Sequence, residues 1–185
     1  MFDAIARSGS KLFPGAAISV ALSVGNKVNA VALADEDPDR AKAWRQRFPV
    51  PLTREYMHGV AILEGKEMDI PDVANAPNED SARIKNFLAT GYRAVTMMPL
   101  LIDGKAIGVL SIVRIDLGQL TNQQLAILRA FAAQATIAIE NTRMVNKLRQ
   151  TNSILEKVSH QLAKYISPQL YQTIISGEQD VIIES

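Results

Sequence analysis

The stretch "GYRAVTMMPLLIDGKAIGVLSIVR" at residues 91–114 consists of two apolar runs joined by the pair Asp103-Gly104. Both runs are rich in residues that favour β-strands, and an Asp-Gly pair is typical of the two-residue turn between antiparallel strands. We therefore expect strands over about 93–101 and 106–114. A hairpin here indicates an antiparallel sheet, and the rest of the chain can be interpreted around it.

A second hairpin is predicted near the start of the chain. The runs at 16–24 and 27–34 have strand composition, and Gly25-Asn26 between them suits a tight turn. Capping residues, helical spacing and proline or glycine stops predict the remaining elements up to residue 91. These are helices over about 2–12, 38–48 and 53–63, a short strand within 68–73, and a helix of about ten residues within 75–91.

The last helix is predicted to be much longer than the others. Thr121 and Gln124 have the spacing of a capping box, and neither glycine nor proline interrupts the chain from there until Pro168. One helix of roughly 45 residues is therefore allowed. The whole order of elements predicts an α+β fold, an α/β sandwich in which an antiparallel sheet carries helices on both faces.

Beyond residue 140 the apolar spacing of this helix becomes a heptad, which is typical of a coiled coil. So narrow an apolar stripe is poorly suited to packing on its own domain, whereas two copies side by side can bury it. We expect a homodimer, and the alternative is that the helix folds back on the sheet. The predicted interface residues are Met144, Leu148, Thr151, Leu155, Val158, Leu162 and Tyr165.

The composition excludes several classes of function. Twenty basic and nineteen acidic residues give a net charge of +1, which argues against nucleic acid as a partner. The chain has no cysteine, which excludes disulfides and thiolate metal sites and favours the cytoplasm. No apolar run is long enough to span a bilayer, so we expect no membrane insertion. His58 has no second histidine near it, and we predict neither a metal site nor a cofactor.

The hairpin at 91–114, followed by "LTNQQLAILRAFAAQATIAIENTRMVNKLR" at 120–149, resembles the second half of a GAF domain, the small-molecule sensor module of signalling proteins. The resemblance implies a six-stranded antiparallel sheet with the first and last helices on one face. It also implies a ligand pocket on the other face, covered by residues 53–92. The Asn-Lys, Phe and Asp-Glu signature of cyclic-nucleotide-binding members is not matched, and the missing cysteine excludes the phytochrome and reductase types.

The end of the chain, "LAKYISPQLYQTIISGEQDVIIES" at 162–185, resembles the connector that precedes the catalytic domain of bacterial class III adenylate or guanylate cyclases. The sequence thus indicates three parts. These are a GAF-like sensor domain at 1–140, a dimeric coiled-coil signalling helix at 141–166, and a connector at 167–185 to an effector domain that we expect to follow.

Six polar residues are predicted to line the rim of the ligand pocket, because they lie beside the short strand, the middle helix and the strand after it. These candidates for binding an unknown small molecule are Asp72, Asn75, Arg83, Tyr92, Arg93 and Thr96. The alternative is that Asp72 and Asn75 cap a turn while Arg83 and Arg93 are solvated. The residues Tyr56, Met57, Phe87 and Met98 either contribute to the pocket or belong to the core.

We interpret the chain as a regulatory sensor and dimerisation module that controls a class III cyclase. A ligand-free dimerisation scaffold, or a sensor of a histidine kinase or transcription activator, remains the alternative. His160 on the long helix lacks the flanking residues of a histidine kinase phosphoacceptor, which favours a solvated side chain. No nucleophile with a neighbouring base is evident, and we expect no catalytic activity from this chain.

Overall fold

The computed structural model describes residues 2–76 and 80–165, with the side chains described as far as residue 162. The chain divides into two compact units, Met1–Ile139 and Glu140–Ser185, and the long helix contributes to both. In chain order the elements are α1 (Phe2–Leu12), β1 (Ala16–Val24), β2 (Lys27–Ala34), α2 (Pro38–Arg45), β3 (Val50–Pro51), α3 (Met57–Glu64), β4 (Met68–Ile70), the short 3-10 helix η1 (Val73–Asn75), α4 (Ser81–Leu88), β5 (Ala94–Ile102), β6 (Lys105–Arg114) and α5 (Asn122–Tyr165).

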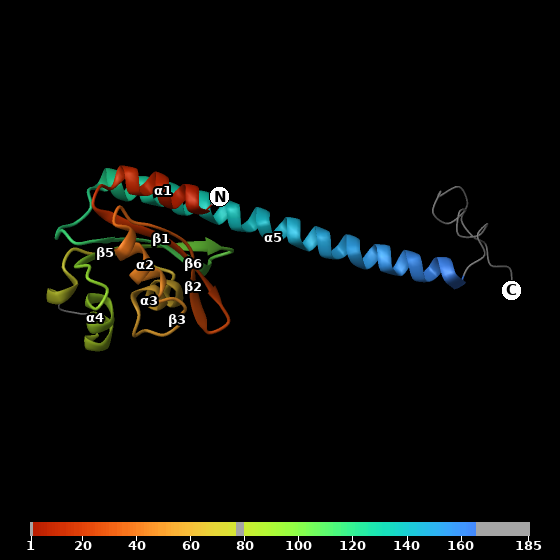
Figure 1. The fold of residues 1–185 in the computed structure, drawn as a ribbon, viewed down its shortest axis with the longest axis horizontal. Coiled ribbons are helices and arrows are strands. Elements are labelled where there is room, and N and C mark those ends of the chain that lie inside the picture. Colours follow the sequence, from red (N-terminus) through yellow and green to blue (C-terminus); the bar gives the residue numbers. More distant parts are fainter. Residues whose placement is uncertain (1, 77–79, 166–185) are drawn as a thin grey trace. The chain divides into compact units, whose positions relative to one another are not determined.

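The first unit contains one six-stranded sheet in the order β3-β2-β1-β6-β5-β4, and every neighbouring pair is antiparallel. Figure 1 shows this sheet among the helices of the first unit. The two predicted hairpins are confirmed within one residue of their expected bounds. Asp103 and Gly104 have φ angles of 49° and 75°, the left-handed values that a two-residue hairpin turn requires. The six-stranded antiparallel sheet with helices on both faces is therefore confirmed.

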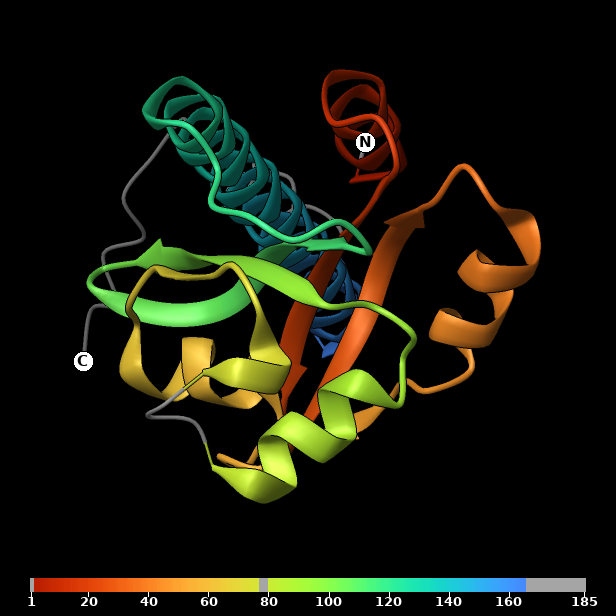
Figure 2. The ribbon, with the colours of Figure 1, turned by 90° about the vertical axis from the view of Figure 1, so that its left-hand side faces the viewer.

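Helices cover both faces of this sheet, and Figure 2 shows α1 and the start of α5 on one face with α2, α3 and α4 on the other. Strand β1 illustrates how the sequence achieves this. Ile18 and Val20 pack in the core beneath α1 and α5, whereas Ala17 and Ala21 belong to the core on the opposite face. Successive side chains of a strand point to opposite faces, so the sheet separates two hydrophobic cores.

Three elements differ from the sequence-based expectations. Strand β3 is not expected from the sequence, because its two residues, Val50 and Pro51, are too few to give a periodic signal. Helix α2 ends at Arg45 instead of continuing to Phe48. Helix α3 begins at Met57 instead of Thr53, because Tyr56 has extended backbone angles and acts as the N-cap.

Helix α5 begins as its sequence predicts. The backbone N–H of Gln124 donates to Oγ1 of Thr121 at 3.2 Å, and the N–H of Thr121 donates to Oε1 of Gln124 at 2.9 Å. This reciprocal pair is a capping box. The helix is 44 residues long, close to the expected length. Its early residues, including Leu128 and Ala135, pack on the sheet within the first unit.

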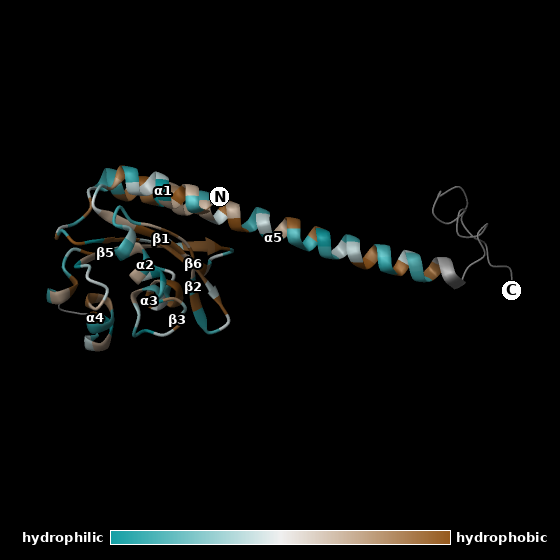
Figure 3. Ribbon diagram, in the orientation of Figure 1, coloured by the Kyte–Doolittle hydropathy of each residue, from teal (hydrophilic) through white to brown (hydrophobic). Residues whose placement is uncertain are grey.

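The second unit presents an apolar stripe in its described part, residues 140–165. Met144, Leu148 and Leu155 are each at least 60% exposed, and Val158 and Leu162 are about half exposed. Figure 3 shows brown apolar bands alternating with teal polar ones along this part of α5. Thr151 is also exposed, while the side chain of Tyr165 lies outside the described residues, as does the connector predicted at 167–185.

The sequence predicts no membrane insertion. None of the described helices is both long enough and apolar enough to cross a bilayer.

Replacing Gly59 with alanine should destabilise the first unit, because an added Cβ would overlap the backbone carbonyl of Thr53. Overpacking of this kind costs roughly 1–3 kcal/mol. Gly9→Ala is the matched control. Its Cβ would meet only the flexible Cδ1 end of Ile18, and alanine is favoured over glycine inside a helix. Denaturant unfolding should show a clear loss for Gly59→Ala and little or no loss for Gly9→Ala, whereas equal losses would contradict the packing of Gly59.

Candidate ligand-binding cavity

A cavity of about 350 Å³ lies in the first unit, on the face of the sheet that carries α2, α3 and α4. It lies on the face of the sheet where the GAF resemblance implies a ligand pocket, but only six of its thirteen lining residues fall within the expected range 53–92. The walls come from the end of α2 and the segment after it, from β3, from the start of α3, from α4, and from one residue of β6. The lining residues are Trp44, Arg47, Phe48, Pro49, Val50, Pro51, Tyr56, Met57, His58, Asn86, Phe87, Thr90 and Val113.

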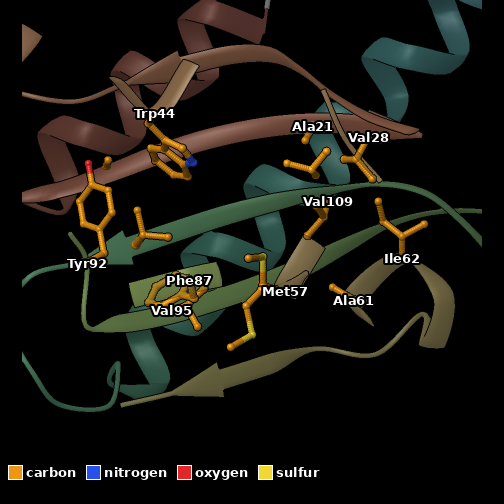
Figure 4. Close-up of a cluster of buried hydrophobic side chains, with 14 of the residues drawn as sticks. Ala21, Val28, Trp44, Met57, Ala61, Ile62, Phe87, Tyr92, Val95 and Val109 are labelled. Atoms are coloured by element: carbon orange, nitrogen blue, oxygen red, sulfur yellow. The ribbon is translucent and has the colours of Figure 1, made fainter. Parts of the chain in front are cut away.

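Aromatic and apolar side chains form most of these walls. Figure 4 shows Trp44, Met57 and Phe87 gathered over the sheet beside Val95 and Val109. The packing of these groups is tight, since Trp44, Met57 and Phe87 are each no more than 6% exposed. Such a surface offers a ligand apolar contacts and ring packing.

His58 is the buried polar group of the cavity. It is 9% exposed, and its ring packs edge-on against Phe48 with centroids 5.2 Å apart. Its Nε2 atom has no hydrogen-bond partner among the described residues. Burial lowers the pKa of His58 from 6.5 to about 4, so the imidazole is neutral at pH 7. A buried polar atom without a partner costs roughly 1–3 kcal/mol. Nε of Arg93 and Nε of Arg114 also lack a partner among the described residues, but His58 is the one of the three that lines the cavity.

Three further polar residues lie on the cavity wall, and all three already donate to backbone carbonyls. The Thr90 hydroxyl donates to the carbonyl of Phe87 at 2.6 Å, and Nδ2 of Asn86 donates to the carbonyl of Glu55 at 2.9 Å. Arg47 is exposed and donates from Nη1 to the carbonyl of Ala89. No carboxylate lines the cavity or pairs with Arg47 among the described residues.

A polar network supports the cavity from behind Trp44. Arg40 donates two bonds to the carboxylate of Asp35, at 2.9 and 2.6 Å, and the Tyr92 hydroxyl donates to the same carboxylate. Burial favours a higher pKa for Asp35, but the bonds from Arg40 and Tyr92 outweigh it and hold the pKa below its ordinary value. The ring of Tyr92 packs on Trp44 with centroids 5.3 Å apart, so this network fixes one wall of the cavity.

None of the six residues predicted for ligand binding is among those that line the cavity. Asp72 caps η1, accepts from Nδ2 of Asn75 at 2.7 Å and pairs with Arg93 at 3.0 Å. The hydrogen bond from Arg93 is the main reason why the pKa of Asp72 is lowered. Arg83 donates from Nε to the carbonyl of Arg54 at 2.8 Å. These four residues therefore bind one another or the backbone.

The other two predicted residues are buried. Tyr92 is 1% exposed and belongs to the network with Asp35. Thr96 is fully buried and donates to Oδ1 of Asp69 at 2.7 Å. Of the apolar candidates, Tyr56, Met57 and Phe87 line the cavity, whereas Met98 packs in the core beneath α1 and α5. The role of the six polar residues in ligand binding stays a prediction.

Sequence reasoning does not select His58 or Arg47 as ligand-binding residues. The helix expected over 38–48 would include Arg47, but α2 ends at Arg45 and the exposed Arg47 lies in the segment that lines the cavity. A lone histidine is a poor candidate for a metal ligand, and no cluster of three or more metal-binding side chains occurs in the described part of the chain. The available signal is the single histidine within "MHGVAIL", the otherwise apolar part of α3 that precedes Glu64.

The comparison with family models decides the family. The GAF domain model matches residues 1–139, which include the whole sheet and every wall of the cavity. The chain belongs to the GAF domain family. Among curated proteins, the sequence has no significant match.

Solved structures confirm the GAF fold at low sequence identity. A GAF domain from an Acinetobacter phosphoenolpyruvate-protein phosphotransferase has a TM-score of 0.63 at 13% identity, covering 79% of this chain and 84% of that one. The second GAF domain of DevS from Mycobacterium smegmatis has a TM-score of 0.60 at 18% identity, covering 80% and 96%. A domain assigned to a two-component sensor histidine kinase of Sinorhizobium meliloti 1021 has a TM-score of 0.62 at 15% identity, covering 80% and 94%.

Replacing His58 with phenylalanine should stabilise the GAF domain, because the variant removes a buried polar atom that has no partner. The gain should grow as the pH falls from 6.5 to 4. In this window the unfolded chain protonates His58 while the folded chain does not, which lowers the free energy of unfolding of the wild type by up to roughly 3 kcal/mol. Denaturant unfolding at pH 7, 5.5 and 4.5 measures the difference between the two proteins.

Comparing the two proteins at each pH isolates His58, because Asp35 and Asp72 titrate in both. A gain that does not change between pH 7 and 4.5 would show that His58 is solvated and would contradict its burial in the cavity wall.

Proposed function

We propose that this chain is the regulatory module of a signalling protein, in which the GAF domain binds a small molecule and the end of α5 pairs with the same helix of a second copy. The observation that carries this proposal is the neutral, unpartnered Nε2 of His58 in a cavity walled by aromatic side chains. A protein that used this domain only as a scaffold would gain stability by an apolar residue at this position. A ligand that bonds to His58 accounts for the histidine.

The exposed stripe of residues 144–162 supports pairing with a second copy. Leu148, Leu155 and Leu162 recur every seven residues and are between 49% and 62% exposed in the single chain. Met144, Thr151 and Val158 occupy the other core position of the same heptad. Apolar side chains at these two positions are buried when two helices wind around each other, and homodimers are the commonest assembly of this kind.

Ligand binding would act by shifting a population. The cavity lies on one face of the sheet and the start of α5 packs on the other, and both cores include residues of β1, β5 and β6. A ligand that fits one arrangement of these strands better than another favours that arrangement by the difference in affinity. Changes in how helices pack at an interface are a common means of transmitting such a shift.

A class III adenylate or guanylate cyclase is the effector that we favour, because residues 162–185 resemble the connector of those enzymes. A histidine kinase is the second candidate, since the fold is also similar to the Sinorhizobium meliloti domain described above. In both cases the module itself performs no turnover. Two effector domains that follow the same end of α5 can meet only if the paired helices run parallel.

Replacing Leu155 with glutamate should convert the dimer to a monomer, because two carboxylates would be forced together at a core position of the heptad. Ser153→Glu is the control, since it adds the same charge at an exposed position on the opposite side of the helix. Sedimentation velocity at micromolar concentration should give a dimer for the wild type and for Ser153→Glu, and a monomer for Leu155→Glu. A wild type that sediments as a monomer would overturn the pairing.

A single cysteine tests whether the helices run parallel, and the chain offers a background free of cysteine. In a parallel pair the two copies of Leu155 face each other, within the distance at which a disulfide forms. Leu155→Cys should therefore cross-link on mild oxidation, whereas Ser153→Cys on the outer side should not. Equal cross-linking of the two variants would indicate random collision, and cross-linking of neither in a confirmed dimer would indicate an antiparallel pair.

A further inference from the structure

The cavity of the GAF domain has features that restrict the chemistry of its ligand. Its volume of about 350 Å³ lies near the lower limit of ligand pockets, which is roughly 300 Å³. A molecule of about one aromatic ring with small substituents fits this space better than a nucleotide. The inference that follows rests on the proposed sensor function.

The walls favour a flat ring. Trp44, Phe48, Tyr56 and Phe87 contribute four aromatic side chains to one small cavity. Aromatic rings pack well against one another in offset or edge-to-face arrangements, as His58 and Phe48 already do at 5.2 Å. An aliphatic chain would gain only the contact area, whereas a ring also gains these specific ring contacts.

The charge on the walls favours an acid. Arg47 is the one charged residue among those that line the cavity, and its guanidinium donates only from Nη1 among the described hydrogen bonds. The remaining N–H groups suit a carboxylate, which guanidinium groups bind through paired hydrogen bonds. None of the described residues that line the cavity is a carboxylate that would repel an anion or attract a cation.

The buried end of the ligand needs a different group. His58 is deeply buried, so the charged group is better placed at the exposed Arg47. A hydroxyl can bond to Nε2 of His58 in either tautomer, as donor or as acceptor. It would then satisfy the one polar atom of the wall that is both buried and unpartnered among the described residues.

We propose that the cavity binds a small hydroxylated aromatic carboxylate, with its ring among Trp44, Phe48 and Phe87, its carboxylate at Arg47 and its hydroxyl at His58. The two anchors differ in kind. The exposed Arg47 selects for charge, and the buried His58 selects for the hydroxyl group. Because a site that bonds to a hydroxyl leaves its own polar atom unpaired with the analogue that lacks it, His58 provides the sharper discrimination.

Isothermal titration calorimetry of the full chain at pH 7 tests the proposal with three matched probes. 4-Hydroxybenzoate carries all three features, benzoate lacks the hydroxyl, and 4-hydroxybenzamide lacks the charge. We expect one 4-hydroxybenzoate to bind per chain. Each analogue should bind roughly fivefold more weakly or worse, because it loses one hydrogen bond or one ion pair. Equal affinity for all three probes, or no heat from any of them at millimolar concentration, would overturn the proposal.

Two variants test which residue binds the hydroxyl and which binds the carboxylate. In His58→Phe the hydroxyl should lose its advantage, so that 4-hydroxybenzoate and benzoate bind alike. In Arg47→Gln the charge should lose its advantage, so that 4-hydroxybenzoate and 4-hydroxybenzamide bind alike. Arg45→Gln, two residues away and outside the cavity lining, and His160→Gln in the second unit are the controls that should keep the wild-type preferences. Preferences that survive in His58→Phe and Arg47→Gln would contradict the assignment.

The ligand class and the sensor function can fail separately. Native mass spectrometry of the chain isolated from cells reports any retained small molecule. A retained molecule that is not an aromatic acid, and that is lost in His58→Phe, would overturn the ligand class and leave the sensor function standing. Failure of all three probes, together with an empty cavity in protein that is dimeric, would count against both and favour the ligand-free scaffold.

Discussion

The central sheet is buried on both faces, and this constraint organises the whole GAF domain. Strands β1, β5 and β6 lie in the interior of the strand order, and consecutive residues in them belong to different cores. Ser19 and Ser111 are fully buried between these strands and satisfy each other through a 2.6 Å hydrogen bond. Because each strand contributes side chains to both cores, a strand that moves on the cavity side would also change the packing beneath α1 and α5.

The side chains of β1 on the cavity side of the sheet are small, and this leaves room for the groups that build the cavity. Ala17, Ser19 and Ala21 occupy that face, opposite the bulkier Ile18 and Val20 on the other. The large side chains of this core come instead from the helices, including Trp44 from α2 and Phe87 from α4. Rings that project from helices onto a surface of small residues leave a hollow, and His58, whose Nε2 has no partner among the described residues, is one of the residues that line it.

Much of the fold can be predicted from the sequence because its signals are local. The Asp103-Gly104 turn, the period of two in the strands and the Thr121 capping box depend on neighbouring residues alone. The cavity cannot be predicted in the same way. It is formed by residues from α2, β3, α3, α4 and β6, which only the tertiary fold brings together. Their position in the sequence makes the polar residues near the short strand look like ligand-binding residues. In the structure such residues bind one another, as Asp72 and Arg93 do.

The proposed transmission of a signal through α5 requires that a second copy covers the stripe of residues 144–162. Amide hydrogen exchange of the intact wild type, read for that stretch over a dilution series, measures this directly. If the helices pair, exchange should be slow at micromolar concentration and should accelerate on dilution, because the paired helices then separate. Fast exchange at every concentration would show an uncovered, fraying helix and would contradict the claim that this domain transmits a signal through a dimer.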